Sequence, residues 1–342
     1  MTLRVGFLGA GLIAGFHSKL IRRSGIDVSR AGVYDPDVLR AQSFAAASGH
    51  RVCASEEEVL DSCDVVYICS WTSEHPRLLA KALDRKLAVF CEKPLATSLA
   101  DAASMAEAVR ASGVTNQVGL VLRRSPAYLW AHRLISDSVS GPVMAVVFRD
   151  DQFIPTQGLY ASTWRGDVAK AGAGTLLEHS IHDVDMLHYL VGDIATVSVH
   201  KANFHGHEGI EDVVTATIEF SGGALGTLTT LWHDNLARPS LRRVEVFCAN
   251  RYVHIEGDDW TGPVHWTDSD GSSHTLAGDE LENAVAALRD GPANPDAAFL
   301  RAVIDRTPAW PDFSVALAAH RVVDAAYRSA NAGGDRQQVP RS

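Results

Sequence analysis

Residues 3–20 read LRVGFLGAGLIAGFHSKL, and they set the expected architecture of the chain. Val5, Phe7 and Leu8 belong to an apolar run typical of a parallel strand that is buried on both faces. The run breaks into the segment 9–14, which has the G-x-G-x-x-A spacing of a dinucleotide-binding turn. In such a turn the first glycine permits the sharp bend, the second lets the backbone approach a pyrophosphate, and the small third residue allows close packing. The helix that follows presents N–H groups and the positive end of its dipole to the phosphates.

The next predicted strand, residues 31–34, ends at Asp35, which lies 20 residues beyond Gly15. A carboxylate there would accept a hydrogen bond from an adenosine ribose and would repel a 2′-phosphate, so it favours NAD over NADP. Arg40, one helical turn later, would weaken this discrimination. Alternatively, Asp35 only caps the next helix, with Pro36 at the first helical position. The two roles are compatible.

Composition excludes several function classes. Hydrophobic residues make up 46% of the 342 residues and charged residues 21%, as in ordinary globular proteins long enough for two domains. The formal net charge of −10 argues against a broad surface for nucleic acid or for an anionic membrane. No apolar run approaches the roughly 18 residues that a membrane span needs. We therefore expect neither a nucleic-acid nor a membrane partner.

The expected location is the cytoplasm. Arg4 and the apolar run after it superficially resemble a secretory signal, but no clean small-x-small cleavage site follows and the strand–helix pattern continues at once. The cysteines are odd in number, match no disulfide or metal spacing, and are expected to be buried reduced thiols. They are Cys53, Cys63, Cys69, Cys91 and Cys248.

Apolar runs and helical patterns alternate up to about residue 120, which is typical of an α/β, doubly wound parallel sheet. We assign residues 1–122 to this Rossmann domain. Ligands of such sheets bind at the carboxyl ends of the strands, here residues 9–11, 70–75 and 92–94. The predicted strands are 3–8, 31–34, 64–69, 87–91 and 116–121, and the predicted helices are 13–23, 36–48, 56–61, 74–84 and 98–111.

Residues 123–330 have the pattern of an α+β domain with a large, open, mostly antiparallel sheet. Ser221-Gly222-Gly223 predicts a hairpin turn within it. The polar residues 331–342 are expected to form a loose tail. The predicted order is helix 125–136, strand 143–149, an irregular stretch 151–171, helix 174–191, strands 195–203, 212–220, 224–232, 242–248 and 251–256, and a closing helix 314–330 with Ser314 as N-cap.

Polar and apolar residues alternate along 215–220, so one face of the second sheet should be packed and the other should not. An exposed apolar sheet face rarely stays uncovered. We therefore expect a subunit interface on that face, in a homodimer or a homotetramer.

The predicted helix 174–191 carries ionisable residues away from its apolar stripe. Glu178, His182 and Asp185 recur at i, i+4 and i+7 on one face. An acid one turn from an imidazole fixes its tautomer and raises its basicity, which suits a general base. The alternative is an ordinary solvated polar face. His179 and His182 are spaced for a metal, but no further ligand set is evident, and we predict no metal site.

Lys93 follows the predicted strand 87–91 directly, so it belongs to the carboxyl edge of the first sheet. An ammonium beside an alcohol oxygen stabilises a developing alkoxide. A cis peptide bond before Pro94 would aim Lys93 into the ligand cleft. The alternative is an exposed pair of Glu92 and Lys93 in a turn, which contributes little.

These segments resemble the glucose–fructose oxidoreductase/inositol dehydrogenase (Gfo/Idh/MocA) family over about residues 3–330. The similar segments are the glycine turn, the triplet Glu92-Lys93-Pro94, the run 172–185 (GAGTLLEHSIHDVD) and the closing 325–330 (AAYRSA). Family members often carry Asp where Glu178 stands and Gly where Ser180 stands. The resemblance implies an NAD(P)-dependent dehydrogenase that acts on CH–OH groups.

The resemblance also implies roles for individual residues. The family's lysine and helix histidine flank the reacting carbinol, and an acid one turn earlier assists; these roles fall on Lys93, His182 and Glu178. The expected cofactor-binding residues are Gly9, Gly11, Leu12, Ile13, Asp35, Ser70, Trp71, His75, Glu92 and Lys93. The candidate substrate-binding residues are Arg123, Tyr160, Trp164, Arg165, His179 and Asp185.

The implied reaction is the oxidation of a secondary alcohol of a sugar or an inositol-like cyclitol, or its reverse, with NAD as cofactor and NADP less favoured. Arg123 and Arg165 would bind ring hydroxyls or an anionic group, or would serve as structural ion-pair partners. Three alternatives remain open: an NADPH-dependent ketone, imine or dihydrodiol reductase, an NAD-dependent glycosidase of the same fold, and a catalytically silent sensor of dinucleotide and sugar.

Overall fold

The computed structural model describes residues 2–158, 161–235, 237–257, 260–289 and 291–340. It divides into two compact units. Unit 1 comprises residues 1–121, 169–171 and 291–317, and unit 2 comprises residues 122–168, 172–290 and 318–342. Among the described residues no helix is both long and apolar enough to cross a bilayer.

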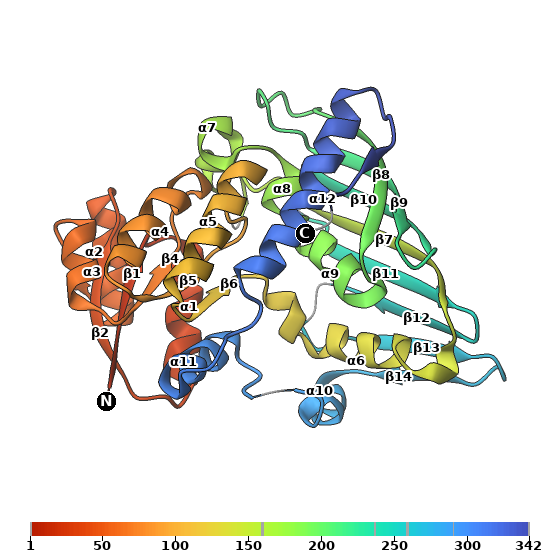
Figure 1. The fold of residues 1–342 in the computed structure, drawn as a ribbon, viewed down its shortest axis with the longest axis horizontal. Coiled ribbons are helices and arrows are strands. Elements are labelled where there is room, and N and C mark those ends of the chain that lie inside the picture. The colour runs from red at the N-terminus through yellow and green to blue at the C-terminus, as the bar shows by residue number, and fades with distance from the viewer. Residues whose placement is uncertain (1, 159–160, 236, 258–259, 290, 341–342) are drawn as a thin grey trace. The chain divides into compact units, whose positions relative to one another are not determined.

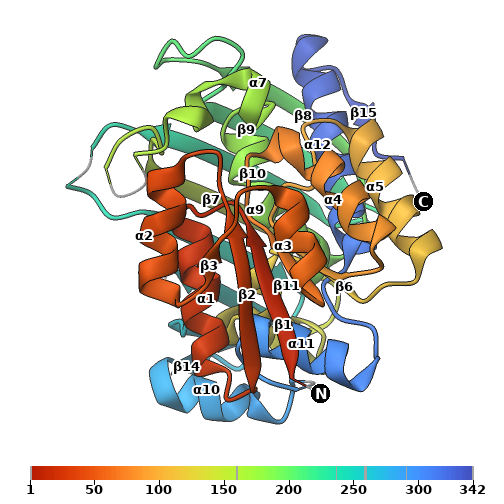
Figure 2. The ribbon, with the colours of Figure 1, turned by 90° about the vertical axis from the view of Figure 1, so that its left-hand side faces the viewer.

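Unit 1 is built on a six-stranded parallel sheet with the strand order β3-β2-β1-β4-β5-β6. Helices α1, α2 and α11 pack on one face, and α3, α4 and α5 on the other (Figure 2). The strands are β1 (Leu3–Leu8), β2 (Val28–Tyr34), β3 (Arg51–Val52), β4 (Val65–Ile68), β5 (Ala88–Cys91) and β6 (Asn116–Val118). The helices are α1 (Leu12–Arg23), α2 (Val38–Ser48), α3 (Glu56–Ser62), α4 (His75–Asp84), α5 (Leu99–Ser112) and α11 (Pro295–Asp305). This confirms the predicted fold, with β3 as an additional short strand.

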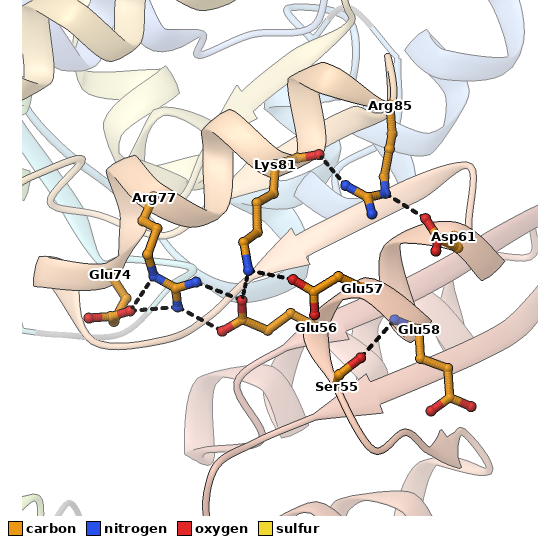
Figure 3. Close-up of polar contacts among 9 residues, drawn as sticks. All are labelled: Ser55, Glu56, Glu57, Glu58, Asp61, Glu74, Arg77, Lys81 and Arg85. Atoms are coloured by element: carbon orange, nitrogen blue, oxygen red, sulfur yellow. Dashed lines mark hydrogen bonds and ion pairs between the residues drawn. The ribbon is translucent and has the colours of Figure 1, made fainter.

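Local sequence explains where these helices start and stop. Ser55 and Ser98 cap α3 and α5, since each hydroxyl accepts a backbone N–H at the third residue of its helix. Gly49 and Gly113 end α2 and α5 with φ of 81° and 68°, where a side chain would be strained. On the surface, Glu56 of α3 bonds Arg77 and Lys81 of α4 (Figure 3).

Residues 291–317 rejoin the first sheet from the far end of the sequence, which the sequence analysis did not anticipate. Val118 at the end of β6 donates its N–H to the carbonyl of Pro311 at 2.9 Å. Phe299 and Leu300 of α11 are fully buried in the core on the side of α1 and α2. Unit 1 therefore contains structure from both ends of the sequence.

Unit 2 is built on a nine-stranded sheet with the order β14-β13-β12-β11-β7-β10-β9-β8-β15, and all pairs except the parallel β7–β10 are antiparallel. Its strands are β7 (Val143–Phe153), β8 (Ile194–Ala202), β9 (Val213–Phe220), β10 (Leu225–His233), β11 (Leu241–Cys248), β12 (Arg251–Glu256), β13 (Val264–Asp268), β14 (Ser273–Leu276) and β15 (Gln337–Gln338). Its helices are α6 (Pro126–Ile135), α8 (Thr175–Glu178), α9 (Ile181–Val191), α10 (Gly278–Ala286) and most of α12 (Phe313–Asn331). The predicted open, mostly antiparallel sheet is confirmed.

Helices α6, α9 and α12 cover one face of this sheet and build its core (Figure 1). The opposite face, called the open face below, carries Val147, Leu225 and Phe247, which are 41%, 58% and 37% exposed. Val146 and Phe148, which point the other way from the same strand, are 1% exposed. The predicted alternation of a packed and an unpacked face therefore holds.

Two local predictions were wrong. Asp312, not Ser314, caps α12, because its carboxylate accepts the N–H groups of Ser314 and Val315. The tail 331–342 is not wholly loose, because Gln337 and Gln338 pair with β8 at the sheet edge. The five cysteines are all buried free thiols, as expected.

Candidate functional site

The glycine turn after β1 has the shape that a diphosphate requires. Gly9 has φ +94°, and a Cβ there would lie 2.5 Å from the carbonyl oxygen of Cys69. A Cβ at Gly11, by contrast, would meet no atom within 4 Å. No side chain of the described residues caps α1, whose first residues Leu12 and Ile13 are 61% and 37% exposed. The N–H groups of Gly9 and Ala10 are bonded to Tyr34 and Asp35, whereas those of the uncapped first turn of α1 are available for phosphate oxygens, so the residues fit a dinucleotide.

Asp35 links the glycine turn to the end of β2. One carboxylate oxygen accepts the N–H of Ala10 and the other the N–H of Asp37, both at 2.9 Å. The alternative role as helix cap belongs instead to Asp37, whose carboxylate accepts the N–H groups of Leu39 and Arg40. Each Asp35 oxygen retains a second lone pair for a ribose hydroxyl. A cavity of about 380 Å³ adjoins it, lined by Tyr34, Asp35, Pro36, Val38, Ala41, Val52, Cys53 and Ala54.

The loop after β4 carries Ser70, Trp71 and His75. Lys170 lies over the Trp71 ring, with its Nζ 4.7 Å from the ring centroid. His75 is 1% exposed and faces three backbone carbonyls, those of Ser70, Pro94 and Leu95. His75 therefore joins this loop to the segment after β5.

The segment after β5 contains Glu92, Lys93 and Pro94, at the carboxyl edge where the first sheet binds ligands. Glu92 is buried and bonds the fully buried His17 of α1 at 2.8 Å. Lys93 is half-buried, and the Lys93–Pro94 peptide bond is cis. The predicted cofactor residues of unit 1 thus share one edge of its sheet.

In unit 2 the predicted helix 174–191 is two helices, α8 and α9, separated at His179 and Ser180. The prediction of one continuous helix was wrong because a strand side chain holds the break. The Thr230 hydroxyl of β10 bonds those of Thr175 and Ser180, at 2.9 and 2.5 Å. Glu178 therefore ends α8, whereas His182 and Asp185 belong to α9.

Glu211, which the sequence analysis missed, anchors the start of α8. Its carboxylate accepts the N–H groups of Gly174 and Leu176 and the hydroxyl of Tyr327 at 2.9–3.0 Å. Burial raises the pKa of Glu211. A Cβ at Gly174 would lie 1.8 Å from the Glu211 carbonyl oxygen, so only glycine fits there. The spacing of glycines in 172–174 was visible, but the acid that they approach lies in a distant loop.

Four predicted residues of unit 2 form two ion pairs. Arg165 donates to Glu178 at 2.6 Å, and its guanidinium lies 4.6 Å from the centroid of the Trp164 ring. Arg123 donates to both oxygens of the buried Asp185 at 2.7–2.9 Å. Burial raises the pKa of Asp185, and the guanidinium of Arg123 opposes that effect.

His179 joins a buried ionic cluster that the sequence analysis missed. Its Nε2 lies 2.8 Å from Asp150 of β7 and 3.0 Å from Arg242 of β11, and Arg242 also bonds Asp183. Burial would raise the pKa of Asp150, but Arg242 and His179 outweigh it and lower the pKa. Burial and the neighbouring Asp150 raise the pKa of Asp183 well above its usual value. The cluster therefore fixes the loop between α8 and α9 next to His182, which is half-buried.

Tyr160, the remaining candidate for the substrate pocket, lies outside the described residues. Across the described ranges no group of three or more His, Cys, Asp or Glu side chains has the geometry of a metal site.

Comparisons with known proteins agree with this architecture. The family profile described as "Oxidoreductase family, NAD-binding Rossmann fold" matches residues 3–120. The "GFO/IDH/MocA C-terminal domain" matches residues 128–254. An inositol 2-dehydrogenase of Cereibacter sphaeroides is 29% identical over 229 residues, which is 65% of this chain and 65% of that protein, just under two thirds of its length. The scyllo-inositol 2-dehydrogenase (NAD(+)) of Bacillus subtilis is 32% identical over 233 residues, 66% of each protein.

A solved structure of levoglucosan dehydrogenase, in complex with NADH and levoglucosan, has the same fold. It is 21% identical in sequence, superposes with a TM-score of 0.89, and each chain is covered completely. The two family profiles together cover most of the sequence and correspond to the two sheets. The chain therefore belongs to the Gfo/Idh/MocA oxidoreductase family, with an NAD-binding Rossmann domain and the family's C-terminal domain.

Proposed function

We propose that this protein is an NAD-dependent dehydrogenase that transfers a hydride between nicotinamide and a secondary alcohol of a sugar or cyclitol. The observation that carries the proposal is the position of the segment 92–94. The buried His17 and His75 hold this segment at the same edge of the first sheet as the glycine turn. A lysine placed by such a segment is suited to binding an alcohol oxygen. The relatives named for inositol oxidation support the substrate class.

Gly9, Gly11, Leu12 and Ile13 would hold the diphosphate, and Asp35 the adenosine ribose. The buried Asp35 carboxylate would repel a 2′-phosphate, which supports NAD over NADP. Ser70, Trp71, His75, Glu92 and Lys93 would form the rest of the cofactor site.

The chemistry follows from the residue types. The nicotinamide, when bound, supplies the hydride acceptor or donor. We assign to His182 the removal of the hydroxyl proton by a ring nitrogen, while the ammonium of Lys93 stabilises the negative charge that develops on the oxygen. Glu178 assists His182 from the preceding helix. Arg123, Trp164, Arg165, His179 and Asp185 are proposed to bind or to support the binding of the substrate hydroxyls.

The proposed assembly is a homodimer or homotetramer joined through the open face, because apolar sheet surface is seldom left in water. The buried free thiols support a cytoplasmic location.

The test is a screen for NAD reduction over inositols, aldoses and sugar acids, with NADP in parallel. We expect turnover of at least one polyol with NAD. Lys93→Ala and His182→Ala should each lower kcat by roughly 10²- to 10⁴-fold while NADH binding persists. Undiminished turnover by Lys93→Ala would refute the proposed chemistry, and faster turnover with NADP would refute the role of Asp35.

A further inference from the structure

His17 occupies an unusual position in α1, between two carboxylates. It is fully buried, with Nε2 2.8 Å from Glu92 and Nδ1 2.8 Å from Asp296 of α11. Burial alone would lower the pKa of His17, but Asp296 and Glu92 outweigh it and raise the pKa to about 10. Both ring nitrogens therefore carry hydrogens at neutral pH, and each donates to a carboxylate.

Glu92 is held at both of its carboxylate oxygens. Oε1 accepts from His17, and Oε2 accepts the backbone N–H of Lys93 at 3.3 Å. A Cβ at Gly119 would lie only 2.3 Å from Oε1 of Glu92, so the absence of a side chain there leaves room for the carboxylate. The orientation of Glu92 is thus set by its neighbours, and the backbone of Lys93 is tied to it.

His75 holds the other end of the same segment. Its Nδ1 lies 3.0 Å from the carbonyl oxygen of Pro94 and 3.2 Å from that of Leu95, and its Nε2 lies 3.3 Å from that of Ser70. Burial lowers the pKa of His75. A neutral imidazole has one hydrogen to donate, and the shortest of these contacts is to Pro94.

We propose that His17 and His75 are positioning residues for Lys93: one holds the segment 92–95 through Glu92 and the other through the carbonyls of Pro94 and Leu95. The inference rests on the proposed catalytic role of Lys93. Neither histidine belongs to the proposed chemistry itself. Their function is to restrict where the Lys93 ammonium lies, since a displacement of about 1 Å in a reacting group lowers rates by up to roughly 100-fold.

The experiment compares His17→Gln and His75→Gln with His50→Gln in the full-length protein. His50 is a matched control because it is a buried histidine of unit 1, 8% exposed, whose ring contacts Phe7 and Phe44 instead of the segment 92–95. We expect the first two variants to lose roughly 10- to 100-fold in kcat. For His17→Gln, whose residue lies outside the proposed cofactor site, NADH affinity should change little. His50→Gln should keep the wild-type kcat, whatever its melting temperature.

Variants of Gly119 and Glu92 test the proposal where a histidine variant fails to fold. Gly119→Ala keeps every ionisable group but displaces the Glu92 carboxylate, and it should lower kcat in the same way. Glu92→Gln keeps an acceptor oxygen for His17 and should retain more activity than Glu92→Ala. In the double variant of both histidines, the losses should be less than additive, because both histidines act on one segment.

A readout independent of turnover separates this proposal from the proposed function. The rate at which a water-soluble reagent acetylates Lys93, measured by mass spectrometry, should change in the His17 and His75 variants and not in His50→Gln. If Lys93→Ala retains activity, the proposed dehydrogenase chemistry is refuted. The acetylation rate of Lys93 in the histidine variants would still show whether His17 and His75 position its side chain. Folded His17→Gln and His75→Gln proteins with wild-type kcat and wild-type labelling would overturn the positioning role.

Discussion

Gly174 allows no side chain. The nearest atoms to a Cβ at this position are the backbone oxygen and nitrogen of Glu211, at 1.8 and 2.6 Å, and neither can rotate away. Gly174→Ala should therefore lower the free energy of unfolding by about 3 kcal/mol, the upper end of the usual cost of overpacking. Urea denaturation measures the effect.

Gly222→Ala is the matched control, because a Cβ at Gly222 in the β9–β10 turn meets no atom within 4 Å. Its denaturation midpoint should remain close to that of the wild type. Equal losses in the two variants would show that the Glu211 contact does not limit residue 174.

At the scale of secondary-structure elements, the break between α8 and α9 depends on the Thr230 hydroxyl of β10. Thr230→Val removes the partner of both Thr175 and Ser180, which leaves two buried hydroxyls without that bond. The expected loss of unfolding free energy is about 1–3 kcal/mol. Thr307→Val, the same change at an exposed position outside both sheets, should be nearly neutral in thermal denaturation. A neutral Thr230→Val would mean that the break has another cause.

The contact between α3 and α4 predicts a dependence of stability on pH. Hydrogen bonds from Arg77 and Lys81 lower the pKa of Glu56 to about 2, against the opposing effect of burial (Figure 3). Because the pKa is depressed on folding from 4.5, this contribution is complete above pH 4.5 and is lost as the pH falls through about 2.

Glu56→Gln should therefore cost about 1 kcal/mol of unfolding free energy at neutral pH. Its difference from the wild type should disappear as the pH approaches 2. Glu107→Gln, which removes a pair whose Glu107 and Arg110 side chains are 62% and 75% exposed, is the control and should have little effect. If the difference in unfolding free energy between Glu56→Gln and the wild type persisted near pH 2, the lowered pKa of Glu56 would not be its cause.

At the scale of the whole molecule, the open face predicts the state of association. Val147→Glu places a charge at the centre of that face and should convert the oligomer to a monomer in analytical ultracentrifugation. Leu288→Glu is the control, because Leu288 is equally exposed, 41%, but follows α10 and is not part of the sheet. A monomeric wild type, or an unchanged mass for Val147→Glu, would contradict the proposed interface.

The parts of the molecule that depend on local pattern could be predicted from the sequence. Gly9, Asp35 and the apolar runs between residues 3 and 121 predict the first sheet, because spacing and hydrophobic period are properties of neighbouring residues. The partners of His17 could not be predicted, since Asp296 lies 279 residues away and no periodicity links them. The break at His179 was missed for the same reason, because the helical pattern runs through it and the determinant is Thr230.

The return of residues 291–317 to unit 1 also has a consequence for biosynthesis. Asp296 meets His17 only after residues 1–296 have been synthesised, so the nascent residues 1–121 emerge with Glu92 but not Asp296 available to the His17 imidazole. Domains usually fold in the order of their synthesis. Unit 1 is therefore the first to begin emerging but is not complete until residue 317, and an excised fragment of residues 1–121 would lack α11, which closes one side of its core.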